Sequence, residues 1–488
     1  MLNPSSFVIN VLTLGYILPL KSTPTMFHAL NNKSCQKHKK FADGAIRELI
    51  AGGLVVEVNA RPHCCNPLTV SDKGKLRLVL DLRHVNQFLE SKTFKYEDLK
   101  TFSEITERGD FFINFDLKSG YHHIDIHPAH QKYLGFQWQF EGEEEITRFF
   151  VFTVLAFGLS PASYVFTKIL RPLTKYWRSK GIKVVIYIDD GIAAKCTEKQ
   201  AEEAGKTIIE TLIAAGFQIN WEKSNFQPKQ EGIWLGTAIN TRTMEFSVTK
   251  EKLIKLKNDF GVILDKKVCN AKNLAKIAGT LSSMHLALGK IVRLFTRKIY
   301  YQIEGRKSWY TTEAAAPGTI EELQFCAQNI EAMNGCSFKP KNTTTKMIFT
   351  DASSTGYGGY MVNRLDEQIC SGSFTEEEAN TSSTFRELLA VRFVLQSFGE
   401  LLKGQNIQIN GDNMAAMRIL SVGSTKPHLQ NIALDIFHYC VKNDIKITPQ
   451  WIPRELNRDA DYFSKIRDSD NWGISTECFE MVQQKFGR

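Results

Sequence analysis

The sequence predicts a multidomain protein that combines α/β and α+β architecture. Its 488 residues, 43% of them hydrophobic, are enough to fill more than one compact core. In two separate parts of the chain, short apolar runs that end in an acidic residue alternate with helical patterns, which is typical of sheets covered by helices. A basic stretch with helical periodicity lies between these parts. We therefore expect two or three domains.

The first strand with a chemical signal runs from Lys75 to Arg83. Its leucines alternate with other residues at period two, so that one face is apolar and the other is mainly basic. The two faces are Leu76, Leu78, Leu80 and Leu82 on one side, and Lys75, Arg77, Asp81 and Arg83 on the other. Exposed basic strand faces are common. This strand alone therefore indicates no particular function.

Three acids in the first half follow apolar strands. Phe111–Asp116 predicts a buried strand that ends in a carboxylate, and the chain turns directly after it. Further along, the run Val184–Ala194 predicts a hairpin, because Asp190-Gly191 between apolar runs is a strong turn signal. The alternative is that Asp189 and Asp190 serve only the turn. A turn needs only one such acid, however, and two adjacent carboxylates repel each other.

A divalent cation held between these three acids would relieve the repulsion. Carboxylates are the hard ligands that Mg²⁺ prefers. In phosphoryl transfer, two Mg²⁺ ions roughly 3.5 to 4 Å apart activate the attacking oxygen and stabilise the leaving one. The three acids therefore indicate a phosphoryl-transfer site.

The second half contains four acids at strand ends or helix starts: Asp351, Glu387, Asp412 and Asp461. Acids at helix starts usually interact with the helix dipole. Thr384 and Glu387 also have the spacing of a helix capping box. Each acid taken alone thus has a structural explanation. Four of them, each at a strand end or helix start within one α/β unit, are a less ordinary observation.

Three motifs of the first half resemble the palm motifs of retroelement reverse transcriptases. They are Phe115-Asp116, Leu155–Pro161 and Tyr187–Asp190, in this order and spacing. The resemblance covers about residues 40–240 and implies the fingers, palm and thumb of a right-hand polymerase. It also implies that Asp116, Asp189 and Asp190 bind two catalytic Mg²⁺ ions, for which Mn²⁺ can substitute.

The same resemblance implies roles for residues around the acids. Arg77 and Lys73 would hold the incoming deoxynucleoside triphosphate, and Tyr121 would lie under its sugar and reject a 2′-hydroxyl. The remaining assignments are Phe157 and Gly158 lining the nucleotide pocket, Lys223 closing over it, and Trp234, Leu235 and Gly236 forming the hairpin that positions the primer end. Phenylalanine at 157 departs from the glutamine of retroviral enzymes and is familiar in retrotransposon relatives.

The four acids of the second half resemble the metal-binding tetrad of the RNase H fold. The resemblance implies an RNase H-like α/β domain that cuts the RNA strand of RNA/DNA hybrids by the same two-metal chemistry. Asp459 competes for the last place, but the Asn-x-x-Ala-Asp pattern selects Asp461. Cellular RNases H carry a mobile histidine loop before this acid, whereas Gln450–Asn457 is short and has no histidine. We therefore expect cleavage in which product release or metal exchange is assisted differently or is slower.

The basic stretch between the two halves would then hold nucleic acid. Residues 250–307 contain fourteen Lys and Arg against four acids, a net charge of +10, while the whole chain carries +9. Apolar residues recur there every three or four positions, which predicts two or more basic helices. A solvated helical face is the ordinary explanation for such a stretch. Its place between two nucleic-acid-processing sites favours a surface that grips phosphates.

These assignments divide the chain into four expected parts. They are fingers and palm at 1–240, a basic helical thumb and connector at 241–338, an RNase H-like domain at 339–466 and a tail at 467–488. The stretch Asn273–Met284 and the tail from Asp470 resemble DIRS-type retrotransposons, which integrate with a tyrosine recombinase. No aspartic protease precedes the polymerase and no integrase follows it, so we expect either a processed unit or a fragment of a longer reading frame.

The expected function is RNA- and DNA-directed DNA synthesis that copies retroelement RNA, together with RNase H cleavage. The expected partners are an RNA template, a DNA primer, RNA/DNA hybrid and deoxynucleoside triphosphates, with a recombinase or other element-encoded proteins in addition. The sequence leaves the oligomeric state open. The competing hypothesis is a catalytically silent nucleic-acid-binding protein descended from a retroelement.

The composition also predicts where the protein works. Ten cysteines without a C-x-x-C pair indicate neither a disulfide framework nor a zinc module. We therefore expect a reducing, intracellular setting, cytoplasmic or nuclear. The apolar run Phe7–Leu20 is too short and interrupted to span a membrane, and it lacks the preceding basic residue of a signal peptide. No membrane association is expected.

Overall fold

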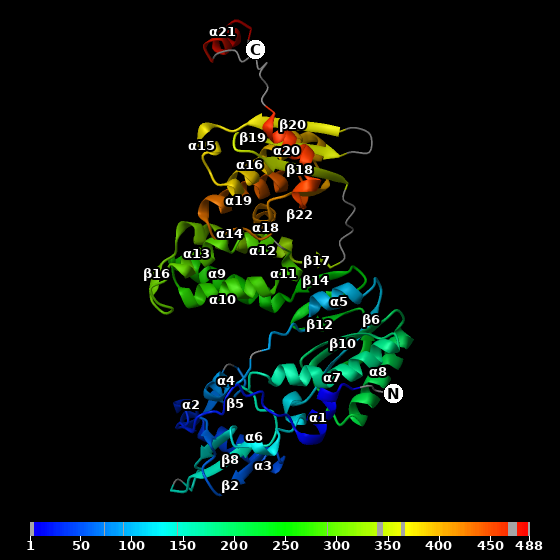
Figure 1. Ribbon diagram of the computed structural model, residues 1–488, viewed down its shortest axis with the longest axis vertical. Helices are drawn as coiled ribbons and strands as arrows, with labels where there is room; N and C mark the ends of the chain where they lie inside the picture. The colour runs from blue at the N-terminus through cyan, green and yellow to red at the C-terminus, as the bar shows by residue number, and fades with distance from the viewer. Residues whose placement is uncertain are drawn as a thin grey trace. The chain divides into compact units, whose positions relative to one another are not determined.

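The chain folds into two compact units (Figure 1). The computed structural model describes residues 4–72, 74–90, 92–143, 145–289, 291–338, 345–362, 367–466 and 476–486. The units comprise Met1–Met244 and Glu245–Arg488. The finer division into four parts stays a prediction.

The first unit contains a four-stranded antiparallel sheet that carries the three expected acids. Its order is β11 (Asn225–Lys229), β6 (Phe111–Asp116), β10 (Asp190–Lys195) and β9 (Lys183–Tyr187). Helices α7 (Ala162–Ser179) and α8 (Glu198–Ala214) pack on these strands. Strand β6 spans the predicted residues, because Phe112, Ile113 and Phe115 are fully buried and their burial supplies a large apolar driving force.

The hairpin that joins β9 to β10 turns earlier than the sequence predicted. Asp190 is already paired within β10, so that the two loop residues are Ile188 and Asp189. Ile188 has a φ of 59°, which a β-branched residue rarely adopts. Gly191 is required by packing and not by the turn, since a Cβ there would lie 2.2 Å from the Phe115 ring. The prediction that Asp190-Gly191 forms the turn was therefore wrong.

A second sheet and a separate hairpin complete the first unit. The sheet has the order β1 (Phe27–His28), β3 (Cys64–Cys65), β7 (Gly135–Trp138), β8 (Arg148–Phe152) and β2 (Val55–Val58), and the hairpin pairs β4 (Leu68–Ser71) with β5 (Arg77–Leu80). Strand β5 is shorter than predicted, because helix α4 begins at Arg83 and runs to Gln87. The Arg83 guanidinium donates to both carboxylate oxygens of Asp81, at 2.6 and 2.9 Å.

The second unit begins with the expected basic helices. They are α9 (Lys250–Lys266), α10 (Ala271–Ser283) and α13 (Arg297–Glu304), and α14 (Pro317–Met333) packs on α9 and α13. Helix α9 buries Leu253, Leu256, Phe260 and Ile263, an apolar stripe at helical spacing that leaves most of its lysines exposed. The prediction of at least two basic helices is confirmed. Within the described ranges, none of the helices combines the length and the apolar content needed to cross a membrane.

A five-stranded mixed sheet follows in the second unit. Its order is β20 (Glu367–Ser373), β19 (Gly356–Val362), β18 (Lys346–Ala352), β21 (Asn406–Gly411) and β22 (Lys446–Trp451). Strands β18, β21 and β22 run parallel, whereas β19 is antiparallel to both of its neighbours. Because parallel strands end at the same edge of a sheet, the acids Asp351 and Asp412 arrive at one edge.

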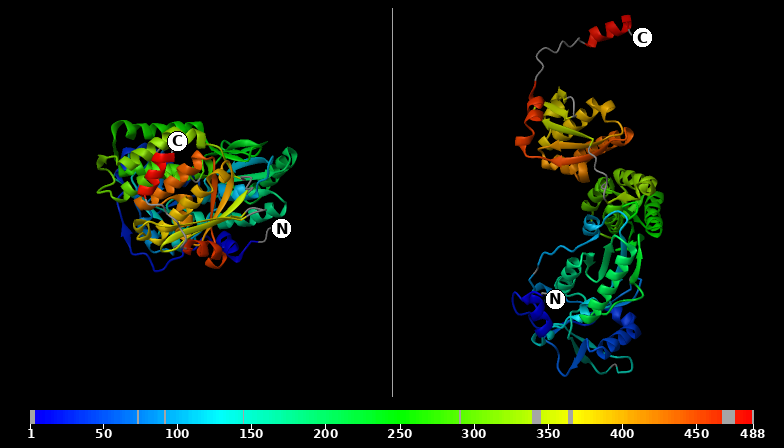
Figure 2. Two further views of the ribbon diagram at one scale, coloured as in Figure 1. Left: turned by 90° about the horizontal axis from the view of Figure 1, so that it is seen from above. Right: turned by 90° about the vertical axis from the view of Figure 1, so that its right-hand side faces the viewer.

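Two glycines let helices approach this sheet closely from opposite faces. Successive residues of a strand point to opposite faces. A Cβ at Gly358 would lie 2.3 Å from the backbone nitrogen of Ser464 on α20 (Arg458–Lys465). A Cβ at Gly359 would lie 2.7 Å from the side chain of Val394 on α16 (Ser383–Ser397). The sheet is therefore held between α16 and α20 (Figure 2).

Candidate active sites

The first unit brings together Asp116, Asp189 and Asp190. Asp116 ends β6 and pairs in register with Asp190 at the start of β10. Asp189 lies at the tip of the adjoining hairpin, where its backbone carbonyl accepts a hydrogen bond of 2.9 Å from the amide of Leu117. The three acids thus occupy one end of two neighbouring strands, as the sequence predicted.

Asp116 is held by two side chains from the segment before β11. Asn220 Nδ2 donates to Asp116 Oδ1 at 2.8 Å, and Lys223 Nζ lies 3.4 Å from the same oxygen. The backbone amide of Asn220 also donates to the Asp116 carbonyl at 2.8 Å. Lys223, which we assigned to the nucleotide pocket, therefore lies at the carboxylates. Asn220 was missed, and its only sequence signal is its position three residues before Lys223.

The other two carboxyl groups resist ionisation. Burial, together with the nearby acids Asp116 and Asp189, raises the pKa of Asp190 to about 6. Burial also raises the pKa of Asp189, and Asp116 adds to this shift. Partly buried acids that raise one another's pKa are typical of groups that share a cation. The geometry and the donor set fit a divalent metal.

The three residues assigned to the primer site lie at the hairpin of β12 (Glu231–Trp234) and β13 (Thr237–Asn240). Trp234 is buried, and its indole Nε1 donates to Asp190 Oδ1 at 2.8 Å. Leu235 and Gly236 form the turn with φ values of 47° and 69°. The hairpin is therefore bonded directly to one of the three acids.

Aromatic rings lie beside this cluster. The ring centroids of Tyr121 and Phe157 are 5.1 Å apart, and Phe157 is 46% exposed. Gly158 has a φ of 105°, and a Cβ there would lie 2.5 Å from the carbonyl oxygen of Leu80, so that only glycine fits. The expected nucleotide-pocket residues Tyr121, Phe157 and Gly158 thus form one surface next to the end of β5.

The residues expected to hold the triphosphate are not joined to the three acids by described contacts. Arg77 is exposed on β5, and within the described residues no hydrogen bond or ion pair joins it to the three acids. Lys73 lies outside the described residues. The phosphate-binding role of both stays a prediction.

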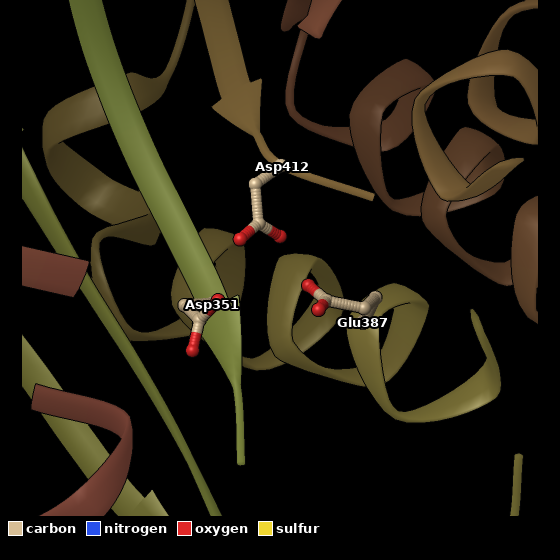
Figure 3. Close-up of side chains that lie close together, drawn as sticks. All are labelled: Asp351, Glu387 and Asp412. Atoms are coloured by element: carbon tan, nitrogen blue, oxygen red, sulfur yellow. The ribbon is translucent and has the colours of Figure 1, made fainter. Parts of the chain in front are cut away.

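The second unit brings Asp351, Glu387 and Asp412 together. One ligand oxygen from each lies within 4.8 Å of the others. Asp351 comes from β18, Glu387 from α16 and Asp412 from the end of β21, and their carboxyl groups point toward one another (Figure 3). They line an open pocket of about 720 Å³ that Asp461 also borders. Asp459 is exposed and is not among its lining residues.

Glu387 is not a helix cap. The N-cap of α16 is Ser382, whose hydroxyl accepts from the amide of Phe385 at 3.3 Å, so the capping-box alternative for Thr384 and Glu387 is wrong. Glu387 is only 5% exposed, and its Oε2 has no hydrogen-bond partner within the described residues. A buried oxygen without a partner is costly unless something binds it. It fits a cation shared with Asp351 and Asp412.

The environment of Glu387 gives a prediction for stability. Burial, with Asp351 and Asp412 nearby, raises the pKa of Glu387 from 4.5 to about 9. Between these pH values the folded protein keeps a proton that the unfolded chain has released, so stability falls as the pH rises through this window. Glutamine mimics the protonated form. Without metal at pH 8, Glu387→Gln should therefore raise the free energy of unfolding by several kcal/mol, on the order of 5 kcal/mol.

Chemical unfolding in EDTA at pH 5 and pH 8 measures this effect. The difference between Glu387→Gln and wild type should grow with pH, while Glu376→Gln, at an exposed site on a neighbouring helix, should show no such trend. A constant difference at both pH values would contradict the raised pKa of Glu387.

The fourth acid of the expected tetrad is paired with cations. Asp461 on α20 accepts from Arg454 Nη2 at 3.2 Å and from Lys465 Nζ. These two bonds lower the pKa of Asp461. The structure therefore places Asp461 at the pocket without bringing it into the close group of three. Arg454, which the sequence reasoning missed, lies in the short segment that has no histidine.

Arg454 should contribute to hybrid binding. Its guanidinium is exposed on the rim of the pocket, where it can contact a backbone phosphate. Arg454→Ala should weaken binding of RNA/DNA hybrids of every sequence and reduce the slope of log affinity against log salt by about 1. Titrations at several salt concentrations measure both effects, with exposed Arg458→Ala as the control. An unchanged salt slope would remove Arg454 from the phosphate contacts.

Two buried polar residues hold this edge of the sheet. Ser464 Oγ donates to Asp351 Oδ2 at 2.9 Å. Asn457 Nδ2 donates to the carbonyl oxygen of Thr350 at 3.0 Å. Both contacts tie β18 to the start or end of α20. They therefore fix Asp351 relative to the helix that carries Asp461.

Two sequence families match the chain. The family described as "Reverse transcriptase (RNA-dependent DNA polymerase)" matches residues 59–239. The family described as "RNase H-like domain found in reverse transcriptase" matches residues 334–409. The first match contains Asp116, Asp189 and Asp190, and the second contains Asp351 and Glu387.

Curated relatives are viral and transposon polyproteins. A putative enzymatic polyprotein of Cassava vein mosaic virus is 24% identical over 461 residues, which cover 89% of this chain and 66% of that protein. The enzymatic polyprotein of Figwort mosaic virus is 23% identical, with 75% and 53% covered. The transposon Tf2-3 polyprotein of Schizosaccharomyces pombe is 22% identical, with 77% and 26% covered. The chain thus spans between about a quarter and two thirds of these relatives.

Solved structures share the fold. The foamy viral protease-reverse transcriptase in complex with RNA/DNA hybrid matches with a TM-score of 0.55 and 17% identity, covering 96% of this chain and 58% of that one. A form of it in complex with double-stranded DNA matches with a TM-score of 0.53 and 16% identity, covering 91% and 73%. The fold is therefore a right-hand polymerase followed by an RNase H-like domain. The chain combines a reverse transcriptase domain with an RNase H-like domain of the kind found in retroelement polyproteins.

Proposed function

We propose that the protein is an RNA- and DNA-directed DNA polymerase that copies retroelement RNA into DNA and cleaves the RNA strand of the resulting hybrid. The observation that carries this proposal is the presence of two separate carboxylate clusters. One is Asp116, Asp189 and Asp190 at a strand hairpin. The other is Asp351, Glu387 and Asp412, with Asp461 at the same pocket. Each lies in or beside the domain whose chemistry needs it.

Each of the two clusters would hold two Mg²⁺ ions, for which Mn²⁺ can substitute. Bound there, the metals would neutralise phosphate charge and lower the barrier to phosphoryl transfer. The chain supplies the seven carboxylates as ligands. Trp234 keeps Asp190 in place through its indole hydrogen bond, and Ser464 does the same for Asp351 through its hydroxyl.

The remaining residues of the polymerase site select and hold the substrates. Tyr121 excludes a nucleotide that carries a 2′-hydroxyl. The ring of Phe157 packs against the ring of Tyr121 and offers its exposed face to the nucleotide. Arg77 and Lys73 bind the triphosphate. The hairpin around Leu235 positions the primer end. The substrates are deoxynucleoside triphosphates, an RNA template, a DNA primer and the hybrid.

The cellular setting and the lineage belong to the same proposal. An intracellular enzyme, cytoplasmic or nuclear, would meet its RNA template. The resemblance of Asn273–Met284 to DIRS-type elements supports that lineage, with a tyrosine recombinase as a further partner. The tail from Asp470 to Gly487 also supports it, and within this tail the structure describes residues 476–486, which form α21 (Thr476–Phe486).

Two assays on one preparation test the function. Primer extension on an RNA template and cleavage of a labelled hybrid should both proceed with Mg²⁺ and both stop in EDTA. The alternative, a catalytically silent nucleic-acid binder, predicts binding of hybrid with neither reaction. Absence of both reactions in a chain that still binds hybrid would overturn the proposal.

A further inference from the structure

We propose that the loop Gly305–Thr311, here called the aromatic loop, binds single-stranded nucleic acid. It connects α13 to β16 (Thr312–Ala314) in the second unit and carries Trp309 and Tyr310 near its C-terminal end. This goes beyond the proposed function, because its residues belong to neither carboxylate cluster and nothing in the two reactions requires them.

Two adjacent large aromatic side chains are exposed in the aromatic loop. Trp309 is 43% exposed and Tyr310 is 71% exposed. Aromatic rings contribute most to stability when they are buried in a core, and rings that stay outside the core are enriched at binding surfaces. The loop therefore offers flat faces to a partner.

Each ring is accompanied by a cation. The Arg306 guanidinium carbon lies 3.9 Å from the Trp309 ring centroid, and Lys272 Nζ lies 4.8 Å from that of Tyr310. A cation stacked on one face of a ring leaves the opposite face for another group. Rings for bases and cations for phosphates are the combination that binds unpaired strands without sequence preference.

The aromatic loop is anchored to its surroundings. The amide of Lys272 donates to the Trp309 carbonyl at 3.1 Å, and Arg306 Nη1 donates to the Ile303 carbonyl at 2.9 Å. At its base, β16 pairs with β15 (Val268–Asn270). A loop fixed in this way loses little conformational entropy when it binds a strand.

Charge and base access favour a single strand as the occupant. The two neighbouring segments 265–272 and 304–313 contain five cations, Lys266, Lys267, Lys272, Arg306 and Lys307, against the three acids Asp265, Glu304 and Glu313. The excess of positive charge favours a polyanion. A duplex offers only phosphates to such a surface, because its bases are already stacked. Unpaired RNA or DNA offers phosphates and free base faces together.

Binding of a short labelled oligouridine to the full chain tests the proposal. Unlabelled RNA/DNA hybrid in excess occupies the duplex-binding surfaces. The double variant Trp309→Ala/Tyr310→Ala should bind the oligonucleotide roughly tenfold more weakly or worse, because stacking contributes this much per base. Trp309→Phe/Tyr310→Phe should stay within about threefold of wild type, since a ring remains. Tyr301→Ala, at a 57% exposed aromatic on α13, is the matched control and should bind as wild type does.

An abasic oligonucleotide of the same length separates stacking from charge. Wild type should bind it about as weakly as the double alanine variant binds oligouridine, and the variant should not distinguish the two. Repeating the series with oligothymidine shows whether the loop takes DNA as well as RNA, and loss in either series supports the site. Unchanged affinity of the double alanine variant for both oligouridine and oligothymidine would overturn it. So would an equal loss of hybrid affinity, which would make the loop a duplex contact.

Discussion

Asp189→Asn should abolish DNA synthesis on an RNA template. The substitution keeps the size of the side chain but removes one of three carboxylate charges at the end of β6 and β10. The loss of that charge should slow extension by roughly three orders of magnitude, the scale on which lost transition-state charge stabilisation slows enzymes. Primer extension with Mg²⁺ measures the rate. Hybrid cleavage by the same preparation should stay within about twofold of wild type, because that reaction would depend on the acids of the second cluster and not on Asp189.

The control for this variant is Glu202→Gln, which removes an exposed acid from α8 in the same unit. It should extend primers as wild type does. If Asp189→Asn also extends at the wild-type rate, Asp189 is not a metal ligand and the hairpin tip has another role.

Asp412→Asn should have the converse effect. Asp412 contributes one of three oxygens that lie within 4.8 Å of one another, and its neighbour Glu387 has a buried oxygen without a hydrogen-bond partner in the described residues. Removal of one charge from so small a group should lower hybrid cleavage by roughly a thousandfold. Extension should be unaffected. Cleavage of a labelled hybrid and extension, measured side by side, decide the outcome.

Asp459→Asn is the matched control, because Asp459 is an exposed acid on the same helix as Asp461 and does not line the pocket. It should leave cleavage unchanged. Loss of both cleavage and extension in a folded Asp412→Asn protein would argue against two separate sites.

Both carboxylate clusters could be located from the sequence because their acids follow strong local signals. A mainly apolar run before Asp116 predicts a buried strand, and a carboxylate at its end has few structural uses. The four acids of the second half each sit at an element boundary that periodicity reveals. In both clusters the local pattern of apolar and polar residues is enough to show where the strands and helices that carry the acids begin or end.

Other features depend on packing between distant segments, and local patterns do not encode it. Asp190-Gly191 has the local form of a turn, yet Gly191 is needed because the Phe115 ring lies over it, and the turn moves to Ile188. Thr384 and Glu387 have the spacing of a capping box, but Ser382 caps the helix and leaves Glu387 to the pocket. A helix cap depends only on the residues of the first helical turn. The burial of Glu387 depends instead on how α16 packs against the whole sheet.

Residues that hold the acids were the hardest to foresee. Asn220 reaches Asp116 across about a hundred residues of chain, and Trp234 reaches Asp190 from a separate hairpin. Arg454 and Lys465 pair with Asp461, which lies outside the close group of three. An amide, an indole or a guanidinium has many uses on a surface, so that its role is defined only by the partner that folding supplies.

The absence of side chains at Gly358 and Gly359 means that almost no other residue can be accepted at these two positions of β19. Asp351 is the direct cross-strand neighbour of Gly358, so a methyl group on Gly358 would push α20 outward beside the carboxylate cluster of the second unit. Any larger residue at either position should therefore displace the sheet from the helix that covers that face.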